Sequence, residues 1–500
     1  MPQDNDLLVQ RRANLEALAR LGVDLYPRQF DRTDTVTRLV EAHGERPKEA
    51  LEAERVETRT SGRILAIRSF GKANFLVISD GRSRVQVYVR KDSLPDLDFQ
   101  VFSLLDLGDF VGVGGHLFRT KTNELTIWAS SLTFLAKCLV PLPEKWHGLQ
   151  DVEIRYRQRY LDLIVTPESG RVFEARSRTL KAIRTFLDAR GFLEVETPMM
   201  QPVAGGALAR PFVTHHNALD MTLYLRIAPE LYLKRLLVGG MERVYEINRN
   251  FRNEGISTQH NPEFTMLEFY QAYSHYLELM TMTEEMLSEV ARAVTGSDQV
   301  TFGGGTISFA APFRRLRMRE AVAEEASRRI GRGVAESELR DRASARDLAR
   351  RLGIEIDPGM GPGKITAALF EALWERALVQ PTFVYDFPTE VSPLSKQRAD
   401  DPDTVERFEL YAGGFELANA FSELNDPAEQ RRRFEQQLAE RQKGDAEAHE
   451  MDEDYVRALE YGMPPAGGEG VGIDRLVMLL TDSRSIRDVI LFPLMRARKE

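Results

Sequence analysis

Between Thr58 and Thr133 the chain alternates apolar and polar residues in short runs such as RVQVYVR and ELTIWAS, with glycines between the runs. Alternation with a period of two indicates half-buried strands, and glycine at the ends of the runs indicates tight turns. About five short strands of this kind predict a small closed β-barrel, for which the OB-fold is the natural candidate. Phe75, Gln86 and Tyr88, with arginines nearby, could stack and hold single-stranded nucleic acid, although aromatic residues in a barrel belong more often to its core.

The pattern outside this segment is mainly helical. Leucines at helical spacing predict an amphipathic helix near the N-terminus, and Arg171 to Pro198 predicts a helix followed by a strand. We therefore expect an α+β protein with a helical segment at 1–57, the barrel at 58–140, a linker at 141–165 and a larger domain at 166–500. A charged, mostly helical insertion is expected around 313–378 of that domain.

The most unusual stretch runs from Arg243 to Tyr270 and mixes arginines, glutamates and asparagines with aromatic residues in a strand-like alternation. A turn at Asn253–Gly255 predicts a hairpin that carries Arg252, Glu254, His260 and Glu268 on its inner face. Burying these groups is costly unless a ligand, a metal or mutual pairing satisfies them. A surface ladder of ion pairs is the simpler alternative, but arginine without lysine favours the binding of planar anions.

Further candidate residues lie elsewhere in the chain. Glu230 begins a predicted helix, where it either complements the helix dipole or binds a cation. Glu409 and Glu416 flank a Gly413-Gly414 turn; two carboxylates beside arginines fit Mg²⁺ bridged to phosphates, and two exposed strand acids fit the same spacing equally well. The segments GMGPGK and GEGVGI lack residues that a phosphate loop and a dinucleotide fingerprint require.

The amino-acid composition excludes several classes of protein. The formal net charge of −9 argues against a generally basic nucleic-acid coat, and the single cysteine, Cys138, excludes an internal disulfide. The N-terminus lacks the apolar core of a secretory signal, and we find no apolar run long enough for a membrane span. The sequence therefore predicts a cytoplasmic protein without a membrane partner.

The segments together resemble bacterial class II lysyl-tRNA synthetases over essentially the whole chain. The resemblance rests on FRNEGISTQHNPEF, GEGVGIDR, RIAPELYLKRLLVGG, EFTMLEFYQAY, FELANAFSELNDP and IRDVILFP. It implies an OB-fold that reads the anticodon and a class II catalytic domain with a six-stranded antiparallel sheet flanked by helices. It also implies a homodimer and ligation of L-lysine to tRNA through a lysyl-adenylate, with ATP as substrate and Mg²⁺ as cofactor.

The resemblance also implies roles for individual residues. Arg252 and Arg475 would be catalytic, and the ATP site would contain Arg252, Glu254, His260, Phe264 and Arg475. Lysine would be bound by Gly206, Glu230, Arg252, Glu268, Tyr270, Asn419 and Glu423. Mg²⁺ would be bound by Glu409 and Glu416, and the anticodon by Phe75, Gln86 and Glu124. Ala418, Ala420 and Leu208 depart from the family's pattern and could tighten the lysine pocket.

Three alternatives remain at this point. An enzyme that lysylates an elongation factor resembles the catalytic half but lacks a barrel. An aspartyl or asparaginyl enzyme of the same subclass would need a cationic partner in its pocket for aspartate. A non-catalytic nucleic-acid-binding protein with a degenerate synthetase body predicts damaged motifs, whereas Arg252, Glu409, Glu416 and Arg475 are all present.

Overall fold

The computed structural model describes residues 2–70, 73–143, 149, 151–207, 209–442 and 451–497. The chain divides into two compact units, Met1–Arg171 and Val172–Glu500. The four domain ranges predicted above are finer than this division and stay a prediction. Among the described residues, none of the helices combines the length and the apolar content that a membrane span requires.

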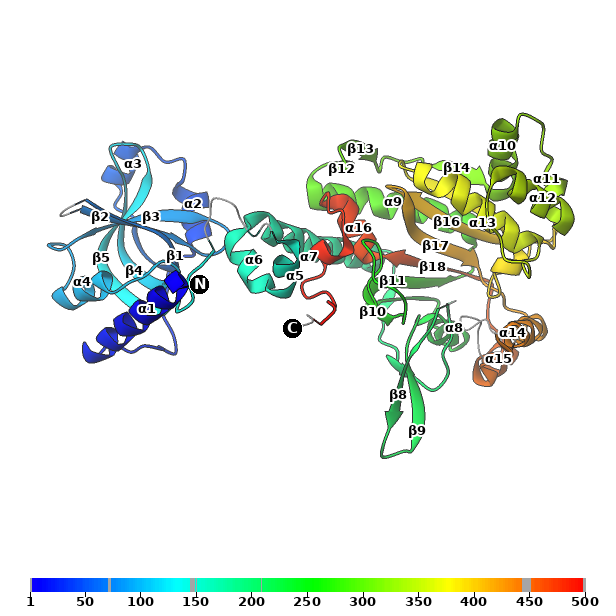
Figure 1. The fold of residues 1–500 in the computed structure, drawn as a ribbon, viewed down its shortest axis with the longest axis horizontal. Coiled ribbons are helices and arrows are strands. Elements are labelled where there is room, and N and C mark those ends of the chain that lie inside the picture. Colours follow the sequence, from blue (N-terminus) through cyan, green and yellow to red (C-terminus); the bar gives the residue numbers. More distant parts are fainter. Residues whose placement is uncertain are drawn as a thin grey trace. The chain divides into compact units, whose positions relative to one another are not determined.

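The first unit contains a closed barrel with the strand order β1-β2-β3-β5-β4 (Figure 1). The strands are β1 (Glu57–Phe70), β2 (Ala73–Ser79), β3 (Arg84–Arg90), β4 (Phe110–Arg119) and β5 (Leu125–Ala136). Their inward positions, such as Leu76, Ile78, Val85 and Val87, are buried in one core. This is the barrel that the period-two alternation predicts.

Helices accompany the barrel in the same unit. They are α1 (Pro2–Arg20), α2 (Val36–His43), α3 (Lys48–Ala53), α4 (Asp96–Ser103), α5 (Val152–Arg157) and α6 (Arg159–Val165). Leu18 of α1 and Leu39 of α2 pack into the barrel core. The N-terminal helix is therefore docked on its own unit.

The second unit is built on an eight-stranded sheet with the order β14-β15-β16-β17-β18-β11-β10-β6. Its strands are β14 (Arg314–Arg317), β15 (Thr382–Pro388), β16 (Thr404–Ala412), β17 (Phe415–Ser422), β18 (Ala466–Gly472), β11 (Glu263–Ala272), β10 (Arg243–Phe251) and β6 (Leu193–Glu194). The six strands from β15 to β10 are antiparallel, as expected, while the short edge strands β14 and β6 pair in parallel.

One face of this sheet is covered by α7 (Pro167–Asp188), α9 (Tyr276–Thr295) and α16 (Ile473–Leu480), which share its largest apolar core. Leu267 and Phe269 of β11 are fully buried in that core. Because side chains alternate along a strand, Met266, Glu268 and Tyr270 are directed to the opposite face. The predicted hairpin of β10 and β11 thus separates an apolar face from a polar one.

The remaining elements of the second unit lie around this sheet. They comprise β7 (Met200–Gln201), β8 (Phe212–His216) and β9 (Met221–Leu225) in a small sheet, the hairpin of β12 (Gln299–Phe302) and β13 (Gly305–Ser308), and the helices α8 (Glu230–Val238), α14 (Pro427–Gln442), α15 (Glu453–Glu460) and α17 (Ile486–Val489). The charged region after Phe313 contains α10 (Met318–Ile330), α11 (Glu336–Arg340), α12 (Arg342–Leu352) and α13 (Pro362–Trp374), which pack on β15 and β16 through a core of their own.

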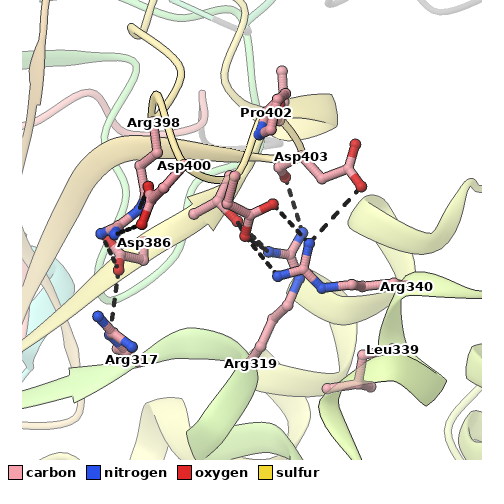
Figure 2. A network of polar contacts seen from close by, with 12 residues as sticks. Arg317, Arg319, Leu339, Arg340, Asp386, Arg398, Asp400, Pro402 and Asp403 are labelled. Carbon is pink, nitrogen blue, oxygen red and sulfur yellow. Dashed lines mark hydrogen bonds and ion pairs between the residues drawn. The ribbon is translucent and has the colours of Figure 1, made fainter.

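Ion pairs attach these helices to the loop that precedes β16, as Figure 2 shows. Asp386 accepts from Arg398 at 3.0 Å and lies 3.4 Å from Arg317, while Arg340 of α11 pairs with Asp401 at 2.6 Å. These arginines therefore have carboxylate partners within the protein.

Candidate active site

A cavity of about 390 Å³ opens on the polar face of the sheet. Its wall is formed by β11, β17 and β18, by the start of α8 and by the loops around Arg252–Asn261 and Val391–Ser395. Of the residues predicted for the site, the wall contains Gly206, Glu230, Arg252, Glu254, His260, Phe264, Glu268, Tyr270, Glu409, Glu416, Asn419 and Arg475. Residues that lie up to 269 positions apart in the chain thus meet in one cavity, and of the predicted set in this unit only Glu423 is absent from its wall.

Arg252 follows directly on β10, where its backbone N–H donates to the carbonyl of Pro262 at 2.8 Å and closes the hairpin. Its guanidinium lies 5.0 Å from the centroid of the Phe264 ring. Burial lowers the pKa of Arg252, against the attraction of Glu254 and Glu416. Its Nε is buried without a hydrogen-bond partner among the described residues, so the side chain is arranged to accept an anionic ligand.

Arg475 reaches the same cavity from the start of α16. One guanidinium nitrogen donates to the carbonyl of Glu416 at 2.6 Å, and the other lies 3.3 Å from Nε2 of His260. Burial and the charge of Arg475 lower the pKa of His260, so its ring is neutral and Nε2 accepts from the guanidinium. The carbonyl and the ring thus hold the Arg475 guanidinium in the wall of the cavity that Phe264 also lines.

The other end of the cavity is strongly acidic. Burial and the nearby Glu230 raise the pKa of Glu268 to about 8, and its Oε2 accepts from the hydroxyl of Tyr270 at 3.1 Å. Burial also raises the pKa of Glu230 and of Glu423. Carboxylates that share a buried site repel one another, and an ammonium group relieves that repulsion.

Glu423 lies just behind the wall rather than in it. Its Oε1 faces the glycine strand, because a Cβ built on Gly468 would lie 2.3 Å from it. The same Cβ would lie 2.3 Å from the ring of Tyr270. The missing side chain of Gly468 therefore lets the main chain of β18 approach both Glu423 and Tyr270 closely.

Glu409 and Glu416 lie on the neighbouring strands β16 and β17 and line the same cavity. Glu409 accepts from Arg407 and from the hydroxyl of Tyr411, each at 2.5 Å, and Glu416 lies 3.5 Å from Arg475. Burial raises the pKa of Glu409, and Glu416 raises it further against the effect of Arg407. Two carboxylates in a cavity with arginines fit a hydrated divalent cation that also binds phosphate.

Three site residues are missing from the sequence prediction. Lys234 is one helical turn after Glu230, and Arg407 is two residues before Glu409 on the same face of a strand, so their spacing is a usable signal. Gly468 belongs to a run of glycines whose spacing shows no ligand by itself. The packing of β18 between β11 and β17 identifies it.

One expectation about the pocket is wrong. Ala418 and Ala420 are buried in the apolar core on the opposite face of β17, so they cannot tighten the lysine pocket directly. They differ in direction from Asn419, which lines the cavity, because neighbouring residues in a strand face opposite sides. Leu208 lies outside the described residues.

The barrel presents its predicted residues on the outer surface. Phe75 and Tyr88 lie 5.0 Å apart between ring centroids, and Tyr88 also contacts Trp128 at 4.9 Å. Gln86 donates to the hydroxyl of Thr126 at 3.1 Å, and Glu124 is exposed at the start of β5. The aromatic residues are thus half-buried outside the aliphatic core, which makes them available for stacking.

Comparison with known proteins agrees with this architecture. The profile described as "tRNA synthetases class II (D, K and N)" matches residues 151–496, and the one described as "OB-fold nucleic acid binding domain" matches residues 59–135. The first match covers more than half of the chain. The chain is therefore a class II aminoacyl-tRNA synthetase, and the predicted fold class is confirmed.

Sequence identity to individual proteins identifies the family within this class. The chain is 56% identical to a lysine–tRNA ligase of Carboxydothermus hydrogenoformans over 494 residues, which is 99% of each protein. It is 55% identical to that of Moorella thermoacetica over 497 residues and 52% identical to that of Staphylococcus aureus over 496 residues, again with 99% of each protein covered. The chain belongs to the lysine–tRNA ligase family.

Proposed function

We infer that the chain ligates L-lysine to tRNA in two steps. L-lysine and ATP give lysyl-adenylate and pyrophosphate, and the lysyl group then passes to the terminal ribose of the tRNA. One observation carries the choice of amino acid: the carboxylates of Glu230, Glu268 and Glu423 converge at one end of a cavity whose other end is lined by arginines. Buried carboxylates gain charge-assisted hydrogen bonds from an ammonium group and are left unpaired by a neutral analogue.

The first step needs positioning and charge neutralisation more than a protein nucleophile, because the substrate carboxylate itself attacks the α-phosphorus. Arg252 would hold both the α-phosphate and the lysine carboxylate, which satisfies its buried Nε. Phe264 and Arg475 would enclose the adenine, with Glu254 and His260 at the nucleotide. Gly206, Tyr270 and Asn419 would complete the lysine site.

Glu409 and Glu416 would hold Mg²⁺. When bound, a divalent cation neutralises the phosphates and orients them. The residues of the chain fit this role because Glu409 keeps its carboxylate directed into the cavity through Arg407 and Tyr411.

An aspartate-specific reading of the same cavity requires a free cation at its acidic end. Arg407, which acts on Glu230, donates to Glu409, and the ammonium of Lys234 lies 2.5 Å from both Glu230 and Glu423. Both cations are already paired and unavailable to an acidic ligand. The cavity therefore favours a cationic amino acid.

The barrel would bind the anticodon through Phe75, Gln86 and Glu124, which supports tRNA as the macromolecular partner in the cytoplasm. A homodimer would form through α7 and the edge strand β6, where Leu193 is 53% exposed although it is apolar. Sedimentation of the purified chain at several concentrations tests the dimer.

Amino-acid-dependent exchange of pyrophosphate into ATP, measured with each amino acid in turn, tests the proposed reaction. Lysine should support exchange, whereas aspartate and asparagine should not. Exchange driven by aspartate would overturn the assignment, and exchange driven by no amino acid would favour the non-catalytic alternative.

A further inference from the structure

A lysine of the protein is buried at the acidic end of the cavity. Lys234 lies on α8 one turn after Glu230, and its side chain is fully buried. Its Nζ lies 2.5 Å from Oε1 of Glu230, 2.5 Å from Oε2 of Glu423 and 5.1 Å from the ring centroid of Phe421. Two carboxylates on separate elements are therefore joined through one ammonium group.

Such burial is expensive unless the charge is paired. Desolvation alone would lower the pKa of Lys234, but Glu230 and Glu423 outweigh it and raise the pKa above its usual range. Lys234 is thus a fixed cation.

The charged groups of the pocket complement those of lysine. The pocket has three carboxylates, those of Glu230, Glu268 and Glu423, whereas lysine brings two ammonium groups, and its own carboxylate is matched by Arg252. Lys234 neutralises the one carboxylate that the ligand leaves over. Its Nζ lies 2.5 Å from Oε2 of Glu423, while Oε1 of the same carboxylate lies on the side of Gly468.

We propose that Lys234 is a positioning residue of the amino-acid site: it is an internal counter-ion that fixes Glu230 and Glu423 and leaves two negative charges for the two ammonium groups of the ligand. This inference rests on the proposed function, because it takes lysine as the ligand. It assigns to the protein's own lysine the task of holding Glu230 and Glu423 in place while the pocket is empty.

Other titratable groups face this ion pair. They are Tyr270 and Glu268 on β11, Tyr455 on α15, Arg235 on α8 and Arg407 on β16. Arg235 is paired with Asp452 at 2.8 Å on the outer side of α8, and Arg407 with Glu409. Without Lys234, the excess negative charge at the acidic end would therefore be relieved by a proton.

The test compares Lys234→Met with the wild type and with Arg235→Met, a matched control that removes a cation from the same helix outside the pocket. Lysine-dependent pyrophosphate exchange is measured between pH 6 and 9 with the KM for lysine and the KM for ATP. In Lys234→Met the acid limb of the kcat/KM profile for lysine should move to higher pH by about one pH unit, because a neighbouring cation lowers carboxyl pKa values by that order. The KM for lysine should rise roughly tenfold at pH 7, with recovery towards pH 9 and an unchanged KM for ATP.

An acid limb at the wild-type position in a folded Lys234→Met would overturn the proposal, as would an equal movement in Arg235→Met. Lys234→Arg keeps the positive charge on a bulkier side chain. The acid limb of its kcat/KM profile should therefore stay at the wild-type pH, even if the KM for lysine rises. A limb that moves in Lys234→Arg as well would also overturn the proposal, including where Lys234→Met fails to fold. Failure of the proposed function is a separate result, since it would appear as absence of lysine-dependent exchange in the wild type.

Discussion

Glu469 is a buried carboxyl group on the core side of β18, and it makes the stability of the protein depend on pH. Its side chain is 1% exposed, and Oε2 lies 2.6 Å from the hydroxyl of Thr283 on α9. That hydroxyl also donates to the carbonyl of Leu279 at 2.7 Å. A hydroxyl has a single hydrogen, so both contacts are hydrogen bonds only if Glu469 is protonated and donates to Thr283.

The size of the effect on the free energy of unfolding follows from the pKa of Glu469. Burial raises the pKa of Glu469 to about 8, against a value of 4.5 in the unfolded chain. A difference of about 3.5 corresponds to at most about 5 kcal/mol between the folded and unfolded states. Below pH 4.5 both states hold the proton and nothing is lost. As the pH rises towards 8 the unfolded chain releases its proton, so the free energy of unfolding decreases, and above pH 8 the loss is complete.

The substitution Glu469→Gln keeps the shape of the side chain and removes its titration. We expect the free energy of unfolding of the variant, relative to the wild type, to increase by several kcal/mol between about pH 5 and pH 8.5 and to be constant above that range. Urea unfolding followed by tryptophan fluorescence and circular dichroism measures this difference. Glu435→Gln, at an exposed position of α14, is the matched control and should give a flat difference. A flat curve for Glu469→Gln would refute the reasoning.

Four further predictions concern the site and the barrel. Arg252→Ala should abolish lysine-dependent pyrophosphate exchange in a folded protein, because it removes the cation placed for the α-phosphate; retained exchange contradicts its role. Glu268→Gln should lower kcat/KM for lysine by about 2 kcal/mol, roughly thirtyfold, as expected for a lost buried charged hydrogen bond; an unchanged value removes the assignment. Gly468→Ala should raise the KM for lysine at least tenfold, since its Cβ would lie 2.3 Å from Glu423, whereas Gly333→Ala, with no atom within 4 Å, should not. Phe75→Ala should weaken tRNA binding by about 1–3 kcal/mol while Phe75→Tyr preserves it, and equal affinity of Phe75→Ala excludes stacking there.

The alternation of the chain predicts much of this architecture. The period-two runs give the barrel, and the polar alternation of β10 and β11 gives a hairpin with one core face and one charged face, because strand geometry turns successive side chains to opposite sides. The two edge strands β6 and β14 are too short for a periodic signal, since each has at most four residues.

The sequence pattern indicates fewer of the site residues than of the strands and helices. Glu268 and Tyr270 stand out because acids and hydroxyls among buried apolar residues need partners. Lys234 does not stand out in the sequence, because a lysine four residues after a glutamate is typical of an exposed helix surface. Its burial depends on α15 and β17, which pack over α8 from distant parts of the chain, and local spacing carries no information about that packing.

The glycines of β18 limit how substitutions can change the shape of the pocket. Gly468 and Gly470 bring bare main chain to the middle of the cavity, where an added Cβ would meet Glu423, Tyr270 or Met266 within 2.8 Å. A wall without side chains offers no position at which a substitution could reshape it gradually. Variation in amino-acid selectivity must therefore come from the two flanking strands and from α8. To admit a larger lysine analogue, substitutions should begin at Met266 and Phe421 and leave β18 unchanged.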